Sequence, residues 1–239
     1  MIIETDLGHD PDDFVAIMWL LLAGKKIDYV SVTPGFDYQV RLLEIIRNQS
    51  GCNFHILVPE LRKDEPQTIA RVYSKTLQSH GSHSGIPDSI GHKALLKSPL
   101  PEVLTIGPIK NVYSSVKEGL VCSSITCQGG FVPYSRYRPK KTLAKFEGQS
   151  SVGSFNPNGA REAFEKIADQ PCLTKFVGKN VCHTFEWTRE TLDNFIFPAD
   201  HNPQLKCLWD SYTSELFRKR GRVKKMHDVL AALMLHDDK

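Results

Sequence analysis

Residues 1–23 have the sequence MIIETDLGHDPDDFVAIMWLLLA, and this stretch decides the fold. It opens with a short apolar run at 1–3, continues through a polar segment rich in aspartate, and enters an apolar run of ten residues at 14–23. A short apolar run, a polar loop and a longer apolar segment are typical of a strand, a turn and a helix. The stretch therefore predicts the first half of a strand–helix–strand unit.

The same order recurs along the first half of the chain. Strands are predicted at 29–32, 54–58 and 103–106, each followed by a helix, at 38–47, 68–77 and 109–116, and a further strand ends at Cys127. Beyond Pro157 the sequence predicts mostly helices, at 160–168, 188–195, 205–217 and 229–235. Alternating strands and helices form a parallel sheet covered on both faces. We expect an α/β protein with a mostly parallel, Rossmann-like sheet, a helical C-terminal part and one domain over residues 1–239.

Ligands of such sheets bind outside the carboxyl ends of the strands. Residues that follow Glu4, Val32, Ile106 and Cys127 are therefore expected to meet in one crevice.

Composition agrees with one compact domain and excludes several classes of protein. The chain has 239 residues, of which 41% are hydrophobic and 24% charged, a balance that argues against disorder. The longest apolar run is about half as long as a membrane-spanning helix requires, so no membrane association is expected. The N-terminus lacks the features of a signal peptide, which predicts a cytoplasmic protein. Six cysteines without a C-x-x-C pair predict reduced thiols rather than a zinc site.

The net charge of +3 hides a local excess of positive charge. Two stretches carry it, one with Arg136, Arg138, Lys140, Lys141 and Lys145, the other with Arg218, Lys219, Arg220, Arg222, Lys224 and Lys225.

Four aspartates follow the first predicted strand: Asp6, Asp10, Asp12 and Asp13. Capping explains part of this cluster, with Asp10 as N-cap, Pro11 at N1, and the next two carboxylates facing the positive end of the helix dipole. It does not explain Asp6, nor a concentration of negative charge that is unfavourable without a cation. Oxygen ligands select Ca²⁺ or Mg²⁺ over zinc. The loop is therefore a candidate metal site.

Five short motifs are spread along the chain. They are ETDLGHDPDD at 4–13, GPIKN at 107–111, QGG at 128–130, SFN at 154–156 and HDVLA at 227–231. In this order they resemble the motifs D-x-D-x-G…D-D, G-P-L-T-N, M-G-G, E-F-N and H-D-x-x-A of the nucleoside hydrolase family, the inosine/uridine-preferring N-ribohydrolases. The chain looks like a short and divergent member.

The resemblance implies a calcium-dependent hydrolase that cleaves the N-glycosidic bond of a nucleoside, in purine or pyrimidine salvage. It implies Asp6, Asp13, Asp228 and the backbone carbonyl of Ile106 as ligands of Ca²⁺, with Mg²⁺ less favoured. Asp6 would also be the general base, and the carboxylate-rich pocket would stabilise an oxocarbenium-like sugar.

For the substrate, the resemblance implies that Asp12 and Asn156 contact the ribose and that His227 interacts with the departing base. Without it, Asp228 would be an ordinary N-cap of the last helix, with His227 as its exposed neighbour. Family members are usually homo-oligomers, so a dimer or tetramer is expected.

The chain departs from the family pattern at positions that bear on the substrate. Ser154 replaces the family's glutamate, which holds the 5′ side of the ribose, Gln149 replaces an asparagine, and Gln128 replaces a methionine. The loop 80–86 is similar to an H-G-x-x-G segment of the family and makes His83 a further candidate for contact with the substrate.

Three alternatives stay open from the sequence. Loss of a carboxylate at Ser154, together with the two basic stretches, would suit a 5′-phosphorylated substrate, either a nucleotide or a nucleic-acid end, although a solvated helix end also accounts for the second stretch. A non-catalytic metal- or nucleotide-binding relative is another possibility. A haloacid-dehalogenase-like phosphatase is disfavoured, because Glu4 stands where its aspartate nucleophile would be.

Overall fold

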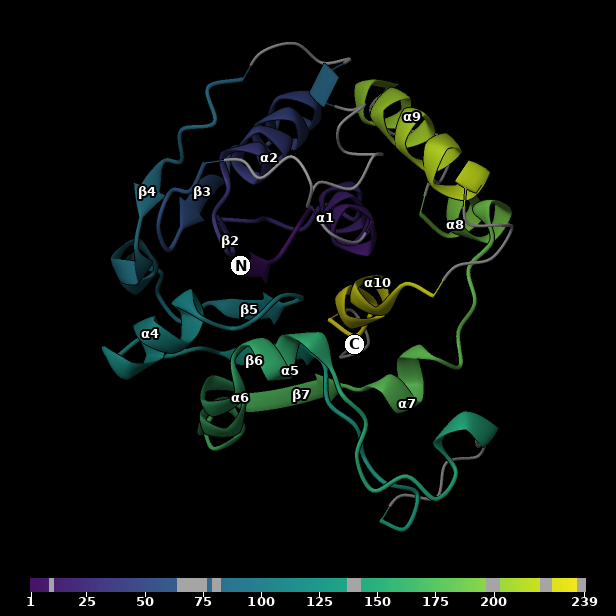
Figure 1. Ribbon diagram of the computed structural model, residues 1–239. Coiled ribbons are helices and arrows are strands. Elements are labelled where there is room, and N and C mark those ends of the chain that lie inside the picture. The colour runs from purple at the N-terminus through teal and green to yellow at the C-terminus, as the bar shows by residue number, and fades with distance from the viewer. Residues whose placement is uncertain are drawn as a thin grey trace.

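A seven-stranded sheet forms the centre of the computed structural model (Figure 1), which describes residues 1–8, 11–63, 77–78, 83–136, 143–196, 203–219 and 225–235. Every pair of neighbouring strands is parallel, in the order β4-β3-β2-β1-β5-β6-β7. The strands are β1 (Ile2–Thr5), β2 (Tyr29–Val32), β3 (His55–Val58), β4 (Ser89–Ile90), β5 (Glu102–Thr105), β6 (Ser124–Gln128) and β7 (Leu173–Val177).

Helices cover both faces of the sheet. One hydrophobic core includes side chains of α1 (Asp12–Leu22), α2 (Asp37–Ser50), α8 (Arg189–Ile196), α9 (Pro203–Lys219) and α10 (His227–Leu233), which Figure 1 shows together in the upper and central part of the view. The other core includes side chains of the 3₁₀ helix η1 (His92–Lys97), of α4 (Asn111–Lys117) and of α6 (Arg161–Ala168). The chain thus forms the covered parallel sheet that the sequence predicts.

The strand order reverses at β1. Ile2 pairs with Tyr29 of β2 on one side and with Val103 of β5 on the other. The chain therefore leaves the carboxyl ends of β1 and β5 in opposite directions, and such a switch point leaves a crevice between the two loops.

Several details differ from the sequence predictions. Helix α1 begins at Asp12 with Pro11 at the N-cap position, one residue later than predicted, and Asp10 lies outside the described residues. The C-terminal part was expected to be helical but contributes β7, which extends the sheet beyond β6. At this edge one side of a strand has no partner, and the LTKFV sequence lacks the apolar run of a central strand. The predicted helix at 68–77 falls mostly outside the described residues.

The sequence analysis also did not predict strand β4, the 3₁₀ helices η1 and η2 (Ala144–Phe146), or the short helices α5 (Phe155–Gly159) and α7 (Lys179–Cys182). Each of these elements has six residues or fewer, which is too short to show a clear hydrophobic period.

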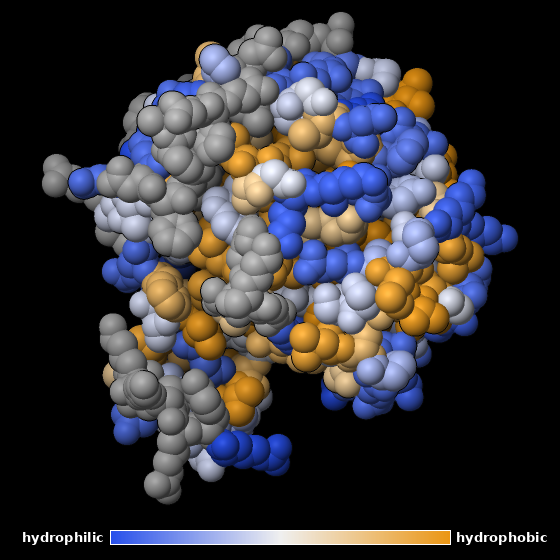
Figure 2. Space-filling view, turned by 180° about the vertical axis from the view of Figure 1, so that it is seen from behind, coloured by the Kyte–Doolittle hydropathy of each residue, from blue (hydrophilic) through white to orange (hydrophobic). Residues whose placement is uncertain are grey.

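Within the described part of the chain, no helix is long and apolar enough to cross a membrane. The face shown in Figure 2 is a mosaic in which small hydrophobic patches alternate with hydrophilic residues. The six cysteines are free, as expected, and burial raises the pKa of Cys127 to about 12.

Glu4 is fully buried and ties β1 to the start of α4. Its Oε1 accepts the backbone N–H groups of Lys110 at 2.9 Å and Asn111 at 2.7 Å, and its Oε2 accepts that of Val112 at 3.0 Å. Burial raises the pKa of Glu4 to about 7, against the opposing effect of these three hydrogen bonds. Glu4 therefore has a structural role, because both oxygens of its carboxyl group accept hydrogen bonds from the backbone.

This buried carboxyl group predicts a pH-dependent stability. The folded pKa of about 7 lies above the ordinary value of 4.5, so the folded state binds the proton more tightly and Glu4 stabilises the fold most at acid pH. The stability of the wild type relative to Glu4→Gln should fall by about 3 kcal/mol between pH 4.5 and pH 8. Urea unfolding with a chelator present measures the difference, and an unchanged difference across this range would contradict the assignment.

Candidate active site

A pocket with a volume of about 370 Å³ opens at the carboxyl ends of β1, β5 and β6. This is the switch point of the sheet, where the sequence predicted a crevice. The pocket is lined by Asp6, Asp12, Asp13, Ile106, Gln128, Phe155, Asn156, His227 and Asp228. Segments separated by more than 200 residues in the chain therefore contribute to one wall.

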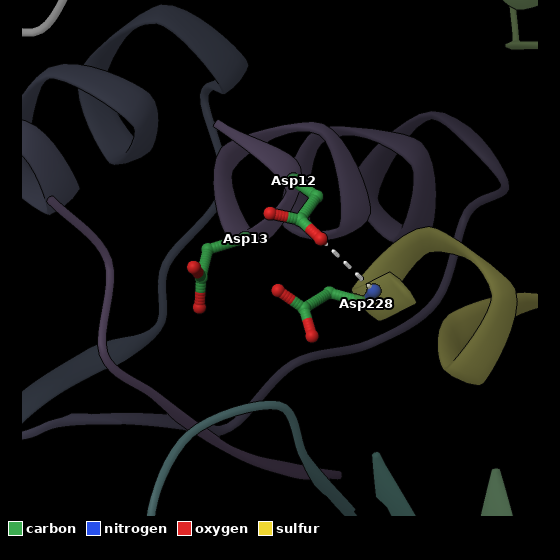
Figure 3. A group of neighbouring side chains, drawn as sticks. All are labelled: Asp12, Asp13 and Asp228. Atoms are coloured by element: carbon green, nitrogen blue, oxygen red, sulfur yellow. Dashed lines mark hydrogen bonds between the residues drawn. The ribbon is translucent and has the colours of Figure 1, made fainter. Parts of the chain in front are cut away.

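Three carboxylates converge in this pocket (Figure 3). Asp12 and Asp13 project from the first turn of α1 and Asp228 from the first turn of α10, and all three are buried. One oxygen from each lies within 4.8 Å of the others. We call Asp12, Asp13 and Asp228 the carboxylate triad.

The triad has the chemistry of a site for a hard cation. At such separations in a buried environment, mutual repulsion of three carboxylates is costly unless a positive charge offsets it. A donor set made only of oxygen suits Ca²⁺ or Mg²⁺ better than zinc. The described residues therefore fit the metal ion that the sequence suggested, although its identity is a separate question.

The membership of the triad differs from the expected set of ligands. Asp6, Asp13 and Asp228 were expected to hold the ion, with Asp12 turned to the substrate. In the structure Asp12 groups with Asp13 and Asp228, and Asp6 lines the same pocket.

A hydrogen-bond network explains the position of Asp12. Its Oδ2 accepts the backbone N–H of His227 at 2.9 Å and that of Asp228 at 3.4 Å. The cap of α10 thus comes from the start of α1, and Asp228 lines the pocket. The interpretation of Asp228 as an ordinary N-cap is wrong, because α10 begins at His227 and the N-cap position is Met226, whose side chain accepts no hydrogen bond from the helix.

The loop after β1 is held by two buried side chains. Thr5 Oγ1 donates to Asp13 Oδ1 and accepts the N–H of Leu7 at 3.1 Å. Gln39 from α2 donates through Nε2 to the carbonyls of Leu7 at 2.6 Å and Thr33 at 3.2 Å. Its Oε1 accepts N–H groups of the loop after β2, at Gly35 and Phe36. Gln39 therefore fixes the loops after β1 and β2 relative to each other.

Gly107 permits the close approach of the loops after β1 and β5. A Cβ atom at this position would lie 2.5 Å from the backbone nitrogen of Asp6 and 3.0 Å from its Oδ1. Any larger residue would push the Asp6 loop away from Ile106. This contact gives a physical reason for the glycine in the GPIKN motif.

Asn156 joins the strand ends on the other side of the pocket. Its Nδ2 donates to the carbonyl of Ile106 at 3.0 Å and to Gln128 Oε1 at 2.8 Å. Gln128, noted in the sequence only as a departure from Met-Gly-Gly, therefore orients a predicted substrate contact. Because a carbonyl oxygen has two lone pairs, the Ile106 oxygen keeps capacity for a further interaction.

Three of the predicted substrate contacts lie outside the wall of this pocket. His83 is half-buried and lies 3.5 Å, through Nδ1, from Asn48 Nδ2 of α2. Gln149 is exposed and donates to the carbonyl of Lys145. Ser154 is buried at the N-cap position of α5, directly before Phe155 and Asn156. The structure therefore brings together seven of the ten predicted site residues. The adjoining His80 and Gly81 lie outside the described residues.

Comparison with known proteins agrees with this geometry. No protein-family model and no curated protein matches the sequence. Among solved structures, a plant nucleoside hydrolase (PpNRh1) matches with a TM-score of 0.65 and 16% identity. An inosine-guanosine nucleoside hydrolase matches with a TM-score of 0.66 and 15% identity. Each match covers 99% of this chain and 78% of the other chain. The chain has the nucleoside hydrolase fold.

The nucleoside hydrolase fold confirms the α/β class and the mostly parallel sheet that the sequence predicted. Its switch point coincides with the carboxylate pocket. Since a fold can host different reactions, the reaction must be argued from the residues of the site.

The Gln39 network predicts a large loss of stability when its polar atoms are removed. Gln39→Met keeps much of the volume but leaves four buried backbone groups without these partners, and it should lower the free energy of unfolding by about 3 kcal/mol. Urea unfolding measures this loss, and the m value should be the same for the variant and the wild type. The control is Gln170→Met. The Gln170 side chain makes one long hydrogen bond, to the Lys166 carbonyl, and its replacement should lower the free energy of unfolding by less than about 0.5 kcal/mol. Equal effects of the two substitutions would contradict the role of Gln39.

Proposed function

We propose that this protein hydrolyses the N-glycosidic bond of a nucleoside or a related N-riboside and releases the base and the sugar. The observation that carries the proposal is the buried carboxylate triad in the pocket at the switch point of a nucleoside hydrolase fold. The order of the five sequence motifs supports it, because four of them contribute residues to this pocket.

We propose Ca²⁺ as the cofactor, held by Asp6, Asp13, Asp228 and the carbonyl of Ile106, with Asp12 at its margin. Calcium accepts six to eight oxygen ligands in a flexible geometry, which suits a mixed set of carboxylates and a carbonyl better than the strict octahedron of Mg²⁺ does. When bound, the ion offsets the repulsion within the triad and lowers the pKa of a water molecule.

The side chains of the pocket supply the remaining chemistry. Asp6 takes a proton from the water whose oxygen bonds to C1′ of the sugar as the C1′–N bond breaks. The negative field of the aspartates stabilises the positive charge that develops on the sugar ring. Asp12 accepts hydrogen bonds from the ribose hydroxyls. Because Nδ2 of Asn156 is engaged with Ile106 and Gln128, its Oδ1 is the atom offered to the sugar.

His227 lines the pocket at the start of α10. We propose that it donates a proton to the departing base, which leaves more readily as a neutral molecule than as an anion.

We also propose that the protein is cytoplasmic, serves nucleoside salvage, and self-associates as a dimer or tetramer. Sedimentation equilibrium measures the last point directly, and a monomer at all concentrations would contradict it.

Turnover should depend on the metal and on the triad. A chelator should abolish release of base from inosine or uridine, and added Ca²⁺ should restore it. Asp13→Asn removes one negative charge from the triad and should lower kcat/KM by about a thousandfold, or about 4 kcal/mol. The control is Asp169→Asn, at an exposed aspartate after α6.

Two other outcomes would contradict the proposed function. Calcium-dependent thermal stabilisation without release of base from any nucleoside or nucleotide would identify a binding protein without turnover. Turnover that ignores both the chelator and Asp13→Asn would contradict the proposed mechanism.

The role of His227 predicts a dependence on the leaving group. His227→Ala should lower turnover of inosine by about a hundredfold or more, the usual contribution of a general acid. A 4-nitrophenyl riboside, whose leaving group needs no proton, should lose far less. Comparison of kcat for the two substrates tests this, and equal losses would show that His227 does not act as the acid.

A further inference from the structure

A cluster of positive charge lies beside the carboxylate pocket. We call Lys145, Lys179 and Lys225 the lysine cluster, and His183 lies among them. Lys145 Nζ is 2.6 Å from His183 Nδ1, and Lys225 Nζ donates to the His183 carbonyl at 2.8 Å. Lys179 Nζ donates to the carbonyl of Gly153. The three lysines come from η2, from α7 and from the segment just before α10, so the fold gathers them from separate elements.

The lysine cluster adjoins the pocket at two points. The rings of His183 and His227 have centroids 4.9 Å apart, and His227 lines the pocket. On the other side, Gly153 lies just before the segment that brings Phe155 and Asn156 to the pocket wall. The cluster therefore flanks the space between α10 and α5.

The ammonium groups are close enough to affect one another. Burial, followed by repulsion from Lys225 and Lys179, lowers the pKa of Lys145. Burial and then repulsion from Lys145 lower the pKa of His183 to about 4, so this ring is neutral near pH 7 and accepts a hydrogen bond. Among the described residues, Glu186 is the carboxylate recorded beside these lysines, with Oε1 3.6 Å from Lys225 Nζ. Three positive charges and one negative charge leave a local excess of two.

We infer that the lysine cluster binds the phosphate of a 5′-phosphorylated N-riboside, so that the preferred substrate is a nucleoside 5′-monophosphate. The inference rests on the proposed function. A phosphate monoester carries about −1.5 to −2 charges at pH 7, which matches the local excess. The carboxylate triad repels such a group, so with the sugar bound at the triad the phosphate lies toward the lysines. Ser154, at the same flank, adds no negative charge that would oppose it.

The cluster also joins the two basic stretches of the sequence. Lys145 belongs to the first and Lys225 to the second, and both contact His183. Lys179 belongs to neither. The side chains of the other basic residues of the stretches, apart from Arg136, lie outside the described part of the structure.

The first test compares substrates with the whole chain in Ca²⁺. Release of base is measured from inosine, uridine, their 5′-monophosphates, and orotidine, whose base carries a carboxylate. We expect kcat/KM to be at least about tenfold higher for the monophosphates than for the nucleosides, and the ratio to fall as ionic strength rises. A ratio of one or less would overturn the inference while leaving the proposed function intact. A gain for orotidine without a gain for uridine 5′-monophosphate would overturn it too, in favour of an acidic base.

The second test uses variants. Lys145→Met combined with Lys225→Met should lower the ratio of kcat/KM for monophosphate over nucleoside by about tenfold or more. The control Lys97→Met changes an exposed lysine near Tyr29 and His55, at the opposite ends of the strands, and should leave the ratio unchanged. A parallel loss for both kinds of substrate in the double variant would indicate a structural role and overturn the inference.

A binding measurement separates this inference from the proposed function. Ribose 5-phosphate should raise the midpoint of thermal unfolding of the wild type and of Lys97→Met more than ribose does, and the difference should vanish in the double variant. Equal shifts for the two sugars in the wild type would overturn the inference. If no substrate releases a base, the proposed function fails, and this binding measurement still decides whether the cluster holds a phosphate.

Discussion

The carboxylate pocket depends on the hydrogen bonds between the Asp12 carboxylate and the first backbone N–H groups of α10. They join residues 215 apart in the chain and set Asp228 beside Asp13. A carboxylate that accepts backbone N–H groups at a helix start is stabilised by the dipole there, which offsets part of the cost of burying three acids together. The remaining cost is what makes the triad a site for a cation.

The last two residues of β1 connect this site to both layers of the fold. Successive side chains of a strand point to opposite faces, so Glu4 meets the start of α4 while Thr5 meets Asp13 of α1. One strand thereby fixes the ends of two helices on opposite faces, and the loop that follows it is bounded by the close approach at Gly107. This arrangement also argues against a phosphatase with an acyl-phosphate intermediate. The residue at its nucleophile position, Glu4, is buried and bonded to three backbone N–H groups.

Much of the fold and of the pocket followed from the sequence, because strand–helix alternation and strand ends carry strong local signals. The positions of Asp6, Asp13 and Ile106 at one pocket required only that parallel strands end at one edge. The position of Asp228, at the start of a helix, came from the resemblance to the nucleoside hydrolases. The sequence did not predict that Asp12 would group with Asp13 and Asp228, because this grouping depends on where α10 packs against α1. Edge strand β7 lacks an apolar run, and Lys179 stands in a short helix far from either basic stretch, so neither gave a local signal. Gln39 was missed for a similar reason: a lone glutamine in a helix carries no signal until its four backbone partners are known.

The two charged clusters constrain each other. The carboxylates of the triad repel one another, and the lysine cluster lies beyond His227, at the flank of the pocket. Separation of the clusters by the rings of His183 and His227 keeps the field negative where a cationic sugar would form and positive where an anionic substituent would lie. A substrate with both features is therefore oriented by electrostatics before any specific contact with its base is made.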